Sequence, residues 1–112
     1  MPGQSDVTLG NLRNTVVIAT AITAAACNAN TTNQQTFTVL GLLPGDQISA
    51  VTKATFQAGL FIAYADVSAK DTLRITFANI TGGSITPTSG DLYTIEINRP
   101  TNLGLTLPTT FT

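Results

Sequence analysis

The chain has 112 residues, a formal net charge of −1, and only 10% charged residues. This length predicts a single domain, and five scattered basic residues leave no basic patch for binding nucleic acid. The absence of histidine and the single cysteine exclude Ser-His-Asp and Cys-His catalysis, and also metal sites built from histidines or several cysteines.

The low proportion of charged residues also bears on assembly. Ordinary soluble domains carry about 25% charged residues, because a charged exterior keeps a free monomer in solution. A chain with so few charges is typical of a surface that other subunits cover. We therefore expect permanent self-association, as a homotrimer or, as the alternative, a homodimer.

The first segments of the chain predict an arm followed by a strand. Residues 1–13 are polar and contain proline and glycine, which predicts an extended N-terminal arm and not a signal peptide. Residues 15–26 contain enough alanine for a helix, but their β-branched residues favour one strand, or two strand segments with a bend. The apolar run ends at Cys27, which we interpret as a small buried hydrophobic residue. It is too short to span a membrane, which takes about 20 residues.

Short strands and turns fill the next part of the chain. Residues 28–33 predict a polar loop, and residues 35–40 a strand with alternating polar and apolar positions. The Pro-Gly pair within residues 41–46 predicts a tight turn, and residues 47–52 a short strand. Gly59 then interrupts the pattern and predicts a bulge or a close backbone approach.

Two strands separated by a polar turn follow. The nearly continuous apolar run at residues 60–67 predicts a central strand buried on both faces. Lys70 and Asp71 supply the turn. Residues 73–78 alternate strictly between apolar and polar side chains, as a half-buried strand does.

The last strand is predicted at residues 92–98, after a loop at residues 81–90, and Pro100 ends it because proline has no N–H to donate. Its inner face should meet that of residues 73–78. The side chains predicted to share one core are Leu73, Ile75, Phe77, Tyr93, Ile95 and Ile97.

Residues 101–112 predict a C-terminal arm. They hold alternating leucines without further core pattern, and we expect them to bind a partner's sheet edge or groove. The predicted partner-binding residues are Leu103, Leu105, Leu107 and Phe111. The alternative is that this tail folds back as one more strand of its own domain.

The pattern as a whole predicts an all-β fold. About six or seven short strands separated by glycine, proline and asparagine turns are typical of a small β-sandwich or a jelly-roll-like barrel. The predicted organisation is an N-terminal arm at 1–13, a β-sandwich domain at 14–100 and a C-terminal arm at 101–112.

The carboxylates do not form a convincing chemical site. Most lie beside turns, where aspartate hydrogen-bonds local backbone. Asp66 and Asp71 could together bind calcium, but the sequence lacks the Asp-x-Asp-x-Asp-Gly spacing. The sequence also lacks tryptophan, which sugar-binding clefts commonly use as a platform. We therefore expect no enzymatic activity, no catalytic residues, no metal and no cofactor.

Three segments, in order along the chain, carry a family resemblance. They are Phe37–Asp46, Ala58–Asn79, and Thr81–Pro87 leading into Tyr93–Pro100. This core resembles a group of small virion proteins of tailed bacteriophages, many of the head decoration or cement type. The resemblance covers somewhat more than half of the chain and leaves both predicted arms outside.

The resemblance implies a function and a location. It implies a capsid decoration or cement protein, made in the host cytoplasm, that binds the outer surface of a phage head and stabilises contacts between capsomers. Its partners would be the major capsid protein and copies of itself, with no nucleic acid and no membrane. The alternative is a structural or host-attachment module of a phage tail or fibre base.

Overall fold

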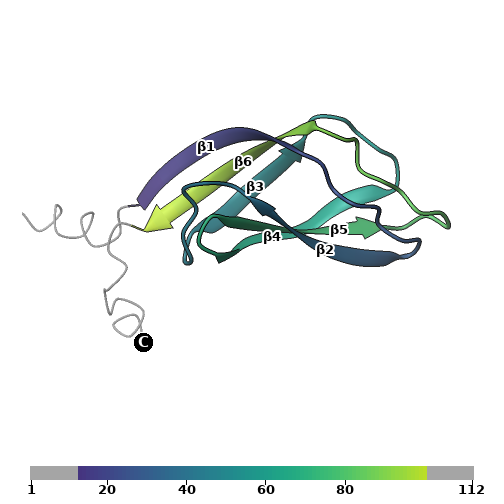
Figure 1. Cartoon of the computed structure of the whole chain (residues 1–112), viewed down its shortest axis with the longest axis horizontal. Coiled ribbons are helices and arrows are strands. Elements are labelled where there is room, and N and C mark those ends of the chain that lie inside the picture. Colours follow the sequence, from purple (N-terminus) through teal and green to yellow (C-terminus); the bar gives the residue numbers. More distant parts are fainter. Residues whose placement is uncertain (1–12, 101–112) are drawn as a thin grey trace, which may run out of the picture.

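The computed structural model describes residues 13–100, which form two three-stranded antiparallel sheets and no helix. One sheet has the strand order β1-β6-β3 and the other β2-β5-β4. Figure 1 shows the two sheets as layers, with β1, β6 and β3 above β2, β5 and β4. The strands are β1 Arg13–Ile22, β2 Thr31–Thr38, β3 Gln47–Lys53, β4 Leu60–Ala69, β5 Thr72–Asn79 and β6 Asp91–Pro100. The predicted all-β class is confirmed.

The core lies between the central strands of the two sheets. The six side chains predicted to share it are all buried there: Leu73, Ile75, Phe77, Tyr93, Ile95 and Ile97. The rings of Phe77 in β5 and Tyr93 in β6 pack edge to face, with their centroids 6.5 Å apart. Because side chains alternate along a strand, β5 and β6 each have one apolar face. These two faces pack against each other, as predicted.

The prediction that residues 60–67 form a central strand buried on both faces is wrong. They belong to β4, an edge strand, because β5 pairs with β2 on one side and with β4 on the other. Leu60 is buried, but Phe61 and Tyr64 are 49% and 59% exposed. A continuous apolar run shows that both faces of a strand are apolar. It does not show whether other strands of the same chain pack on those faces.

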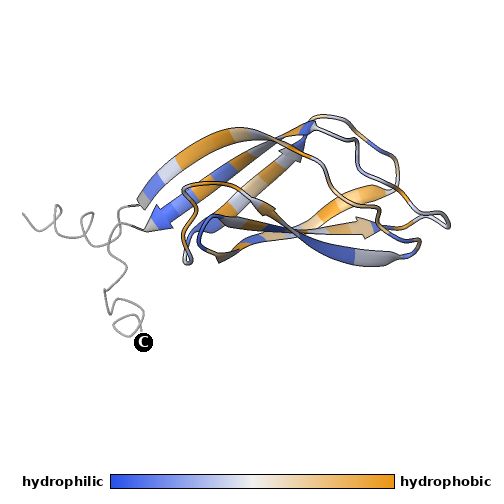
Figure 2. Ribbon diagram, in the orientation of Figure 1, coloured by the Kyte–Doolittle hydropathy of each residue, from blue (hydrophilic) through white to orange (hydrophobic). Residues whose placement is uncertain are grey.

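The predicted loop at residues 28–33 is wrong in its second half. β2 begins at Thr31, because the backbone from Thr31 onward pairs with the end of β5 at Asn79. Its side chains are mostly polar, and Figure 2 shows β2 as one of the bluest strands. The polar composition of residues 31–33 is similar to that of a loop because β2 is an edge strand with an exposed outer face.

The strand interpretation of residues 15–26 is confirmed as far as Ile22, where β1 ends. Beyond it, Cys27 forms an isolated antiparallel bridge with Ile85. The Cys27 side chain is fully buried, as predicted. The chain crosses from β1 in one sheet to β2 in the other without a helix.

The close backbone approach predicted at Gly59 is also confirmed. Gly59 has a φ of +84°, and a Cβ atom at this position would collide with Cγ2 of Thr81. Asn79 braces the same loop, since its amide nitrogen donates to the carbonyl oxygens of Cys27 and Gly83 at 3.0 and 2.8 Å. Its side-chain oxygen accepts from the Thr81 N–H at 2.9 Å. Because the described residues hold no helix, none of them forms a helical membrane span.

Candidate binding surfaces

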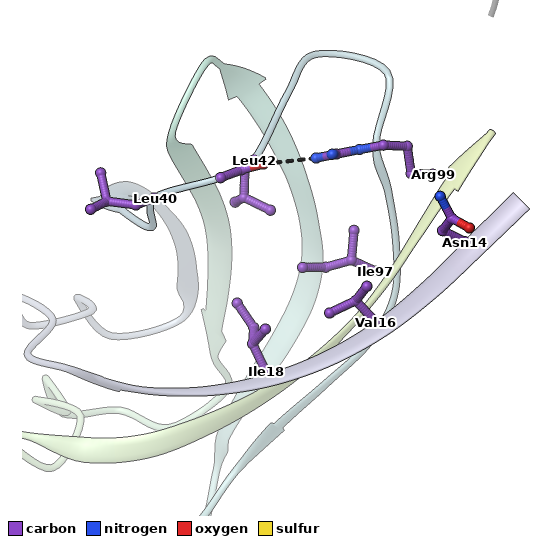
Figure 3. A pocket seen from close by; sticks show the side chains of 8 residues that line it. Asn14, Val16, Ile18, Leu40, Leu42, Ile97 and Arg99 are labelled. Carbon is purple, nitrogen blue, oxygen red and sulfur yellow. Dashed lines mark hydrogen bonds between the residues drawn. The ribbon is translucent and has the colours of Figure 1, made fainter. Parts of the chain in front are cut away.

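A cleft of about 230 Å³ opens between β1, the end of β6 and the loop that follows β2. Figure 3 shows the side chains that surround it. They are Asn14, Val16, Ile18, Leu40, Leu42, Ile97 and Arg99, together with the backbone of Gly41. Val16 is 49% exposed and Leu40 is 80% exposed. The cleft is therefore a mainly apolar surface that remains open to solvent.

The β1 side of this cleft follows from strand geometry. Asn14, Val16 and Ile18 occupy every second position, so they lie on the same face of β1. That face is the inner one, because Val16 pairs with Ile97 and Ile18 pairs with Ile95, both buried residues of β6. The exposure of Val16 therefore means that the space between the two sheets is uncovered at this end of β1.

Arg99 holds the opposite wall of the cleft in place. Its Nε donates to Oδ1 of Asp46 at 2.7 Å and its Nη2 donates to Oδ2 at 2.6 Å. The same Nη2 also donates to the carbonyl oxygen of Gly41 at 2.7 Å, the contact dashed in Figure 3. Asp46 also accepts a hydrogen bond from the Leu43 N–H at 3.0 Å. These bonds tie the 41–46 turn to the end of β6.

The Arg99–Asp46 pair also sets the charge of the cleft. The hydrogen bonds from Arg99 hold the pKa of the Asp46 carboxyl below its ordinary value, although burial acts in the opposite direction. The same pairing raises the pKa of Arg99. Both groups are therefore ionised and balance each other at neutral pH. The cleft favours an uncharged apolar ligand over an anion.

A second exposed surface lies on and beside β4. We define the aromatic edge as Phe56, Phe61 and Tyr64, which are 83%, 49% and 59% exposed. Phe61 pairs with Ala78 and Tyr64 with Thr76, so both aromatic residues lie on the outer face of their sheet. The register shift between Ile62 and Tyr64 makes this possible, because a bulge moves Tyr64 to the same face as Phe61.

The edge strands differ in how readily they accept another strand. β3 has a register shift between Ile48 and Ala50, and β4 has two. Bulges of this kind twist an edge and discourage pairing with another chain. β1, in contrast, pairs with β6 in one continuous register from Arg13 to Ile22. The regular edge of the first sheet is therefore that of β1.

The carboxylates form hydrogen bonds and ion pairs that stabilise the fold. Asp66 pairs with Arg74 on the outer face of its sheet, with Nε of Arg74 donating to Oδ1 at 2.8 Å. Asp71 accepts a hydrogen bond from the Gly41 N–H at 2.7 Å. Asp66 and Asp71, considered above as a calcium-binding pair, therefore make two separate contacts with different residues. In the part of the chain that the structure describes, no three His, Cys, Asp or Glu side chains are grouped to hold a metal.

Asp91 makes the remaining buried ion pair. Its carboxylate accepts from the N–H and the hydroxyl of Thr55, both at 3.0 Å, and lies 3.1 Å from Nζ of Lys53. Burial raises the pKa of Asp91, but the hydrogen bonds from Thr55 and Lys53 outweigh it and hold the pKa below its ordinary value. Asp46 thus binds the backbone of its own turn, as the sequence predicted, whereas Asp71 and Asp91 bind backbone 30 and 36 residues away in the chain.

The residues that the sequence predicts to bind a partner lie outside the described residues. They are Leu103, Leu105, Leu107 and Phe111, within the predicted arm at 101–112, and the predicted arm at 1–13 lies almost entirely outside as well. Neither of the two surfaces described above was predicted from the sequence. Phe61 and Tyr64 lie in an apolar run that predicts burial. Only the bulge between them distinguishes these exposed residues from the buried residues of the same run. Val16 and Leu40 lie in segments predicted as strands, and nothing in the sequence indicates that they meet.

Comparisons with protein-family models, with curated proteins and with solved structures give no match to this chain.

Proposed function

We propose that this chain is a structural virion protein of a tailed phage, a decoration or cement protein bound to the outer surface of the head. In this role it contacts the major capsid protein and stabilises the junctions between capsomers. The role requires a rigid domain with uncovered binding surfaces. It requires no catalysis, no metal and no cofactor.

The domain fits a small jelly-roll-like sandwich in this proposal. β1 pairs with β6 in one sheet and β2 pairs with β5 in the other, so the second pair lies inside the first in sequence order. β3 pairs with the other side of β6, and β4 pairs with the other side of β5. Greek-key connections of this nested type are typical of jelly rolls, which are common in capsid proteins. The likeness concerns topology alone, and the function must be argued from the surfaces.

The observation that carries the proposal is the aromatic edge. A chain with only 10% charged residues exposes three aromatic side chains, at Phe56, Phe61 and Tyr64, on one edge of a small domain. Exposed apolar patches of this kind mark protein–protein contacts, and aromatic residues are enriched at the centres of such contacts. We assign the aromatic edge to the capsid.

The remainder of the outer face of the same sheet supports a protein partner over a nucleic acid. The side chains of β5 that point inward are buried. Those that point outward include Thr72, Thr76 and Arg74, whose charge is balanced by Asp66 on β4. A face of hydroxyl groups and one closed ion pair has no net positive charge to attract phosphates. It fits the polar rim of a protein interface around aromatic residues.

Binding to heads tests the proposal directly. Purified full-length chain is mixed with phage heads that lack it, and the heads are sedimented. We expect the wild-type chain to sediment with the heads and a Phe61→Ser/Tyr64→Ser variant to stay in the supernatant. The matched control is Thr32→Ser/Thr36→Ser, two exposed positions on β2 of the same sheet, which should bind as the wild type does. A wild-type chain that never sediments with heads overturns the proposal.

A further inference from the structure

We infer that the cleft between β1 and residues 40–42 receives the leucine tail of a second copy of this chain, residues 101–107, as an added strand on the free edge of β1. This inference rests on the proposed function, which makes the chain part of an assembly. It names the contact through which copies join. The aromatic edge remains available for the capsid.

The first support is the free edge of β1. The strand order β1-β6-β3 places β1 at the border of its sheet, with β6 on one side only. Among residues 13–100, no backbone hydrogen bond joins the other side of β1 to any segment. A regular ten-residue edge with unpaired N–H and C=O groups is a template for another strand.

The second support is the match between cleft and tail. A strand added beside β1 would place every second side chain over the cleft, next to Val16 and Ile18. Residues 101–112 contain leucine at every second position from 103 to 107, and they contain no charged residue. Apolar side chains at that spacing fit an apolar cleft whose one charged lining residue, Arg99, is already paired with Asp46. Strand addition with pockets for alternate side chains is a common way to bind peptides.

The third support is where the tail begins and ends. It leaves β6 after Pro100, beside Arg13 at the start of β1. Pro108 follows the leucines and has no N–H for a sheet, so it limits the pairing segment to the residues before it. The seven residues from 101 to 107 would span at most about 25 Å when extended, which is shorter than β1. The tail therefore fits within the length of that edge.

The same geometry favours a second copy over the tail's own chain. β6 already occupies the opposite side of β1, so the tail would have to cross the start of β1 to reach the free edge. That crossing covers two strand spacings, about 9.5 Å. Only Thr101 and Asn102 separate Pro100 from Leu103. Three extended residue steps cover at most about 11 Å, which leaves no residue for the reversal of direction.

Chemical cross-linking between two distinguishable chains tests the inference. One full-length chain carries Val16→Cys, and a second, enlarged by a tag, carries Leu105→Cys. The native Cys27 is fully buried and stays unreactive in both. After mixing and treatment with a short bis-maleimide, we expect a covalent heterodimer. The control replaces Val16→Cys with Thr32→Cys, an exposed position in the other sheet, and should give none.

Three results would overturn the inference. The first is equal cross-linking from Val16→Cys and Thr32→Cys. The second is cross-linking only within single chains that carry both Val16→Cys and Leu105→Cys, which would place the tail on its own domain. The third is the absence of any cross-link between the chain with Val16→Cys and the chain with Leu105→Cys.

The oligomeric state gives an independent readout. A variant with Leu103→Ser, Leu105→Ser and Leu107→Ser keeps residues 13–100 intact, so its circular dichroism spectrum should match that of the wild type. We expect sedimentation at micromolar concentration to give an oligomer for the wild type and a smaller species for this variant. Identical species for both would contradict the inference. Head binding by the isolated chain is scored separately, so either proposal can fail while the other holds.

Discussion

Arg99 and Asp46, 53 residues apart in the chain, form a two-pronged ion pair that joins the end of β6 to the turn before β3. The Asp46 side chain is only 2% exposed, while that of Arg99 is 36% exposed. The pair fixes the 41–46 turn, and residues 40–42 at the start of that turn form one wall of the cleft. Its contribution to the stability of the fold should depend on pH.

Replacing Asp46 with asparagine should lower stability at neutral pH and weaken the loss of stability in acid. Because the folded pKa of Asp46 lies below the ordinary value of 3.8, its contribution is present above pH 3.8 and is lost as the pH falls through the folded pKa. Asp46→Asn should cost about 1–3 kcal/mol at pH 7, towards the lower end because solvent reaches Arg99. Urea unfolding at a series of pH values measures both effects.

Asp66→Asn is the comparison for Asp46→Asn. Asp66 accepts the same kind of paired hydrogen bonds, from Arg74, but its side chain is 25% exposed. Its removal should cost less at pH 7 than that of Asp46. If Asp46→Asn and the wild type lose stability in parallel below pH 4, the ion pair does not act as described.

Replacing Gly59 with alanine should destabilise the fold, because its φ of +84° is strained for other residues and the new Cβ would meet the Thr81 methyl group. We expect a loss of about 1–3 kcal/mol in unfolding free energy. Gly82→Ala is the matched control, since a Cβ there meets nothing within 4 Å, and it should stay within about 0.5 kcal/mol. Adding Thr81→Ser, which removes the methyl group, should recover part of the Gly59→Ala loss. Equal effects at the two glycines would contradict the close approach.

Tyr93→Phe should leave stability unchanged or raise it. The Tyr93 hydroxyl is buried without a hydrogen-bond partner, and an unpaired buried donor costs about 1–3 kcal/mol. Tyr64→Phe, on the exposed aromatic edge, is the control and should change nothing. A loss of more than about 1 kcal/mol in Tyr93→Phe would mean that the hydroxyl finds a partner in solution.

The same substitution should also change the alkaline behaviour. Burial raises the pKa of Tyr93 from 10.0 to about 12, so the folded state holds this proton more tightly than the unfolded chain does. That difference stabilises the fold fully below pH 10 and is lost as the pH rises through about 12. Melting curves of Tyr93→Phe should therefore fall less steeply above pH 10 than those of the wild type.

Phe77→Ala should be the most damaging of these changes, because Phe77 is fully buried and packs edge to face against Tyr93. Removal of a buried phenylalanine costs about 3–5 kcal/mol. Phe61→Ala, on the same residue type at 49% exposure, should cost far less. Chemical denaturation of both variants measures the difference, and similar losses would place Phe77 outside the core.

The sequence predicted the core well because alternation in β5 and β6 depends only on local geometry. Leu73, Ile75 and Phe77 must share a face in any strand, and that face must be buried. The order of the strands in the sequence does not indicate which of them lie at the edges of a sheet. The apolar run of β4 therefore led to the wrong prediction of a central strand. Whether a second chain covers Phe61 and Tyr64 is a property of the assembly.

The candidate surfaces were harder to predict than the core. The cleft exists only because β1, β6 and the loop after β2 converge, and its shape depends on the contact between Arg99 and Asp46. No local pattern encodes a contact between residues so far apart in the chain. The leucine tail, in contrast, was visible as a spacing in the sequence, because a strand's side-chain period does not depend on its partner.

The amount of this chain in purified phage particles tests the central claim most directly. Quantitative mass spectrometry of particles from the phage that encodes it compares its copy number with that of the major capsid protein. A decoration protein should be present in numbers comparable to the capsid protein, and a density map should place its two-sheet domain on the outer surface of the head. A small fraction of that number, with density at the tail or fibre base, would contradict the assignment to the head, and absence from the particle would contradict a structural virion function altogether.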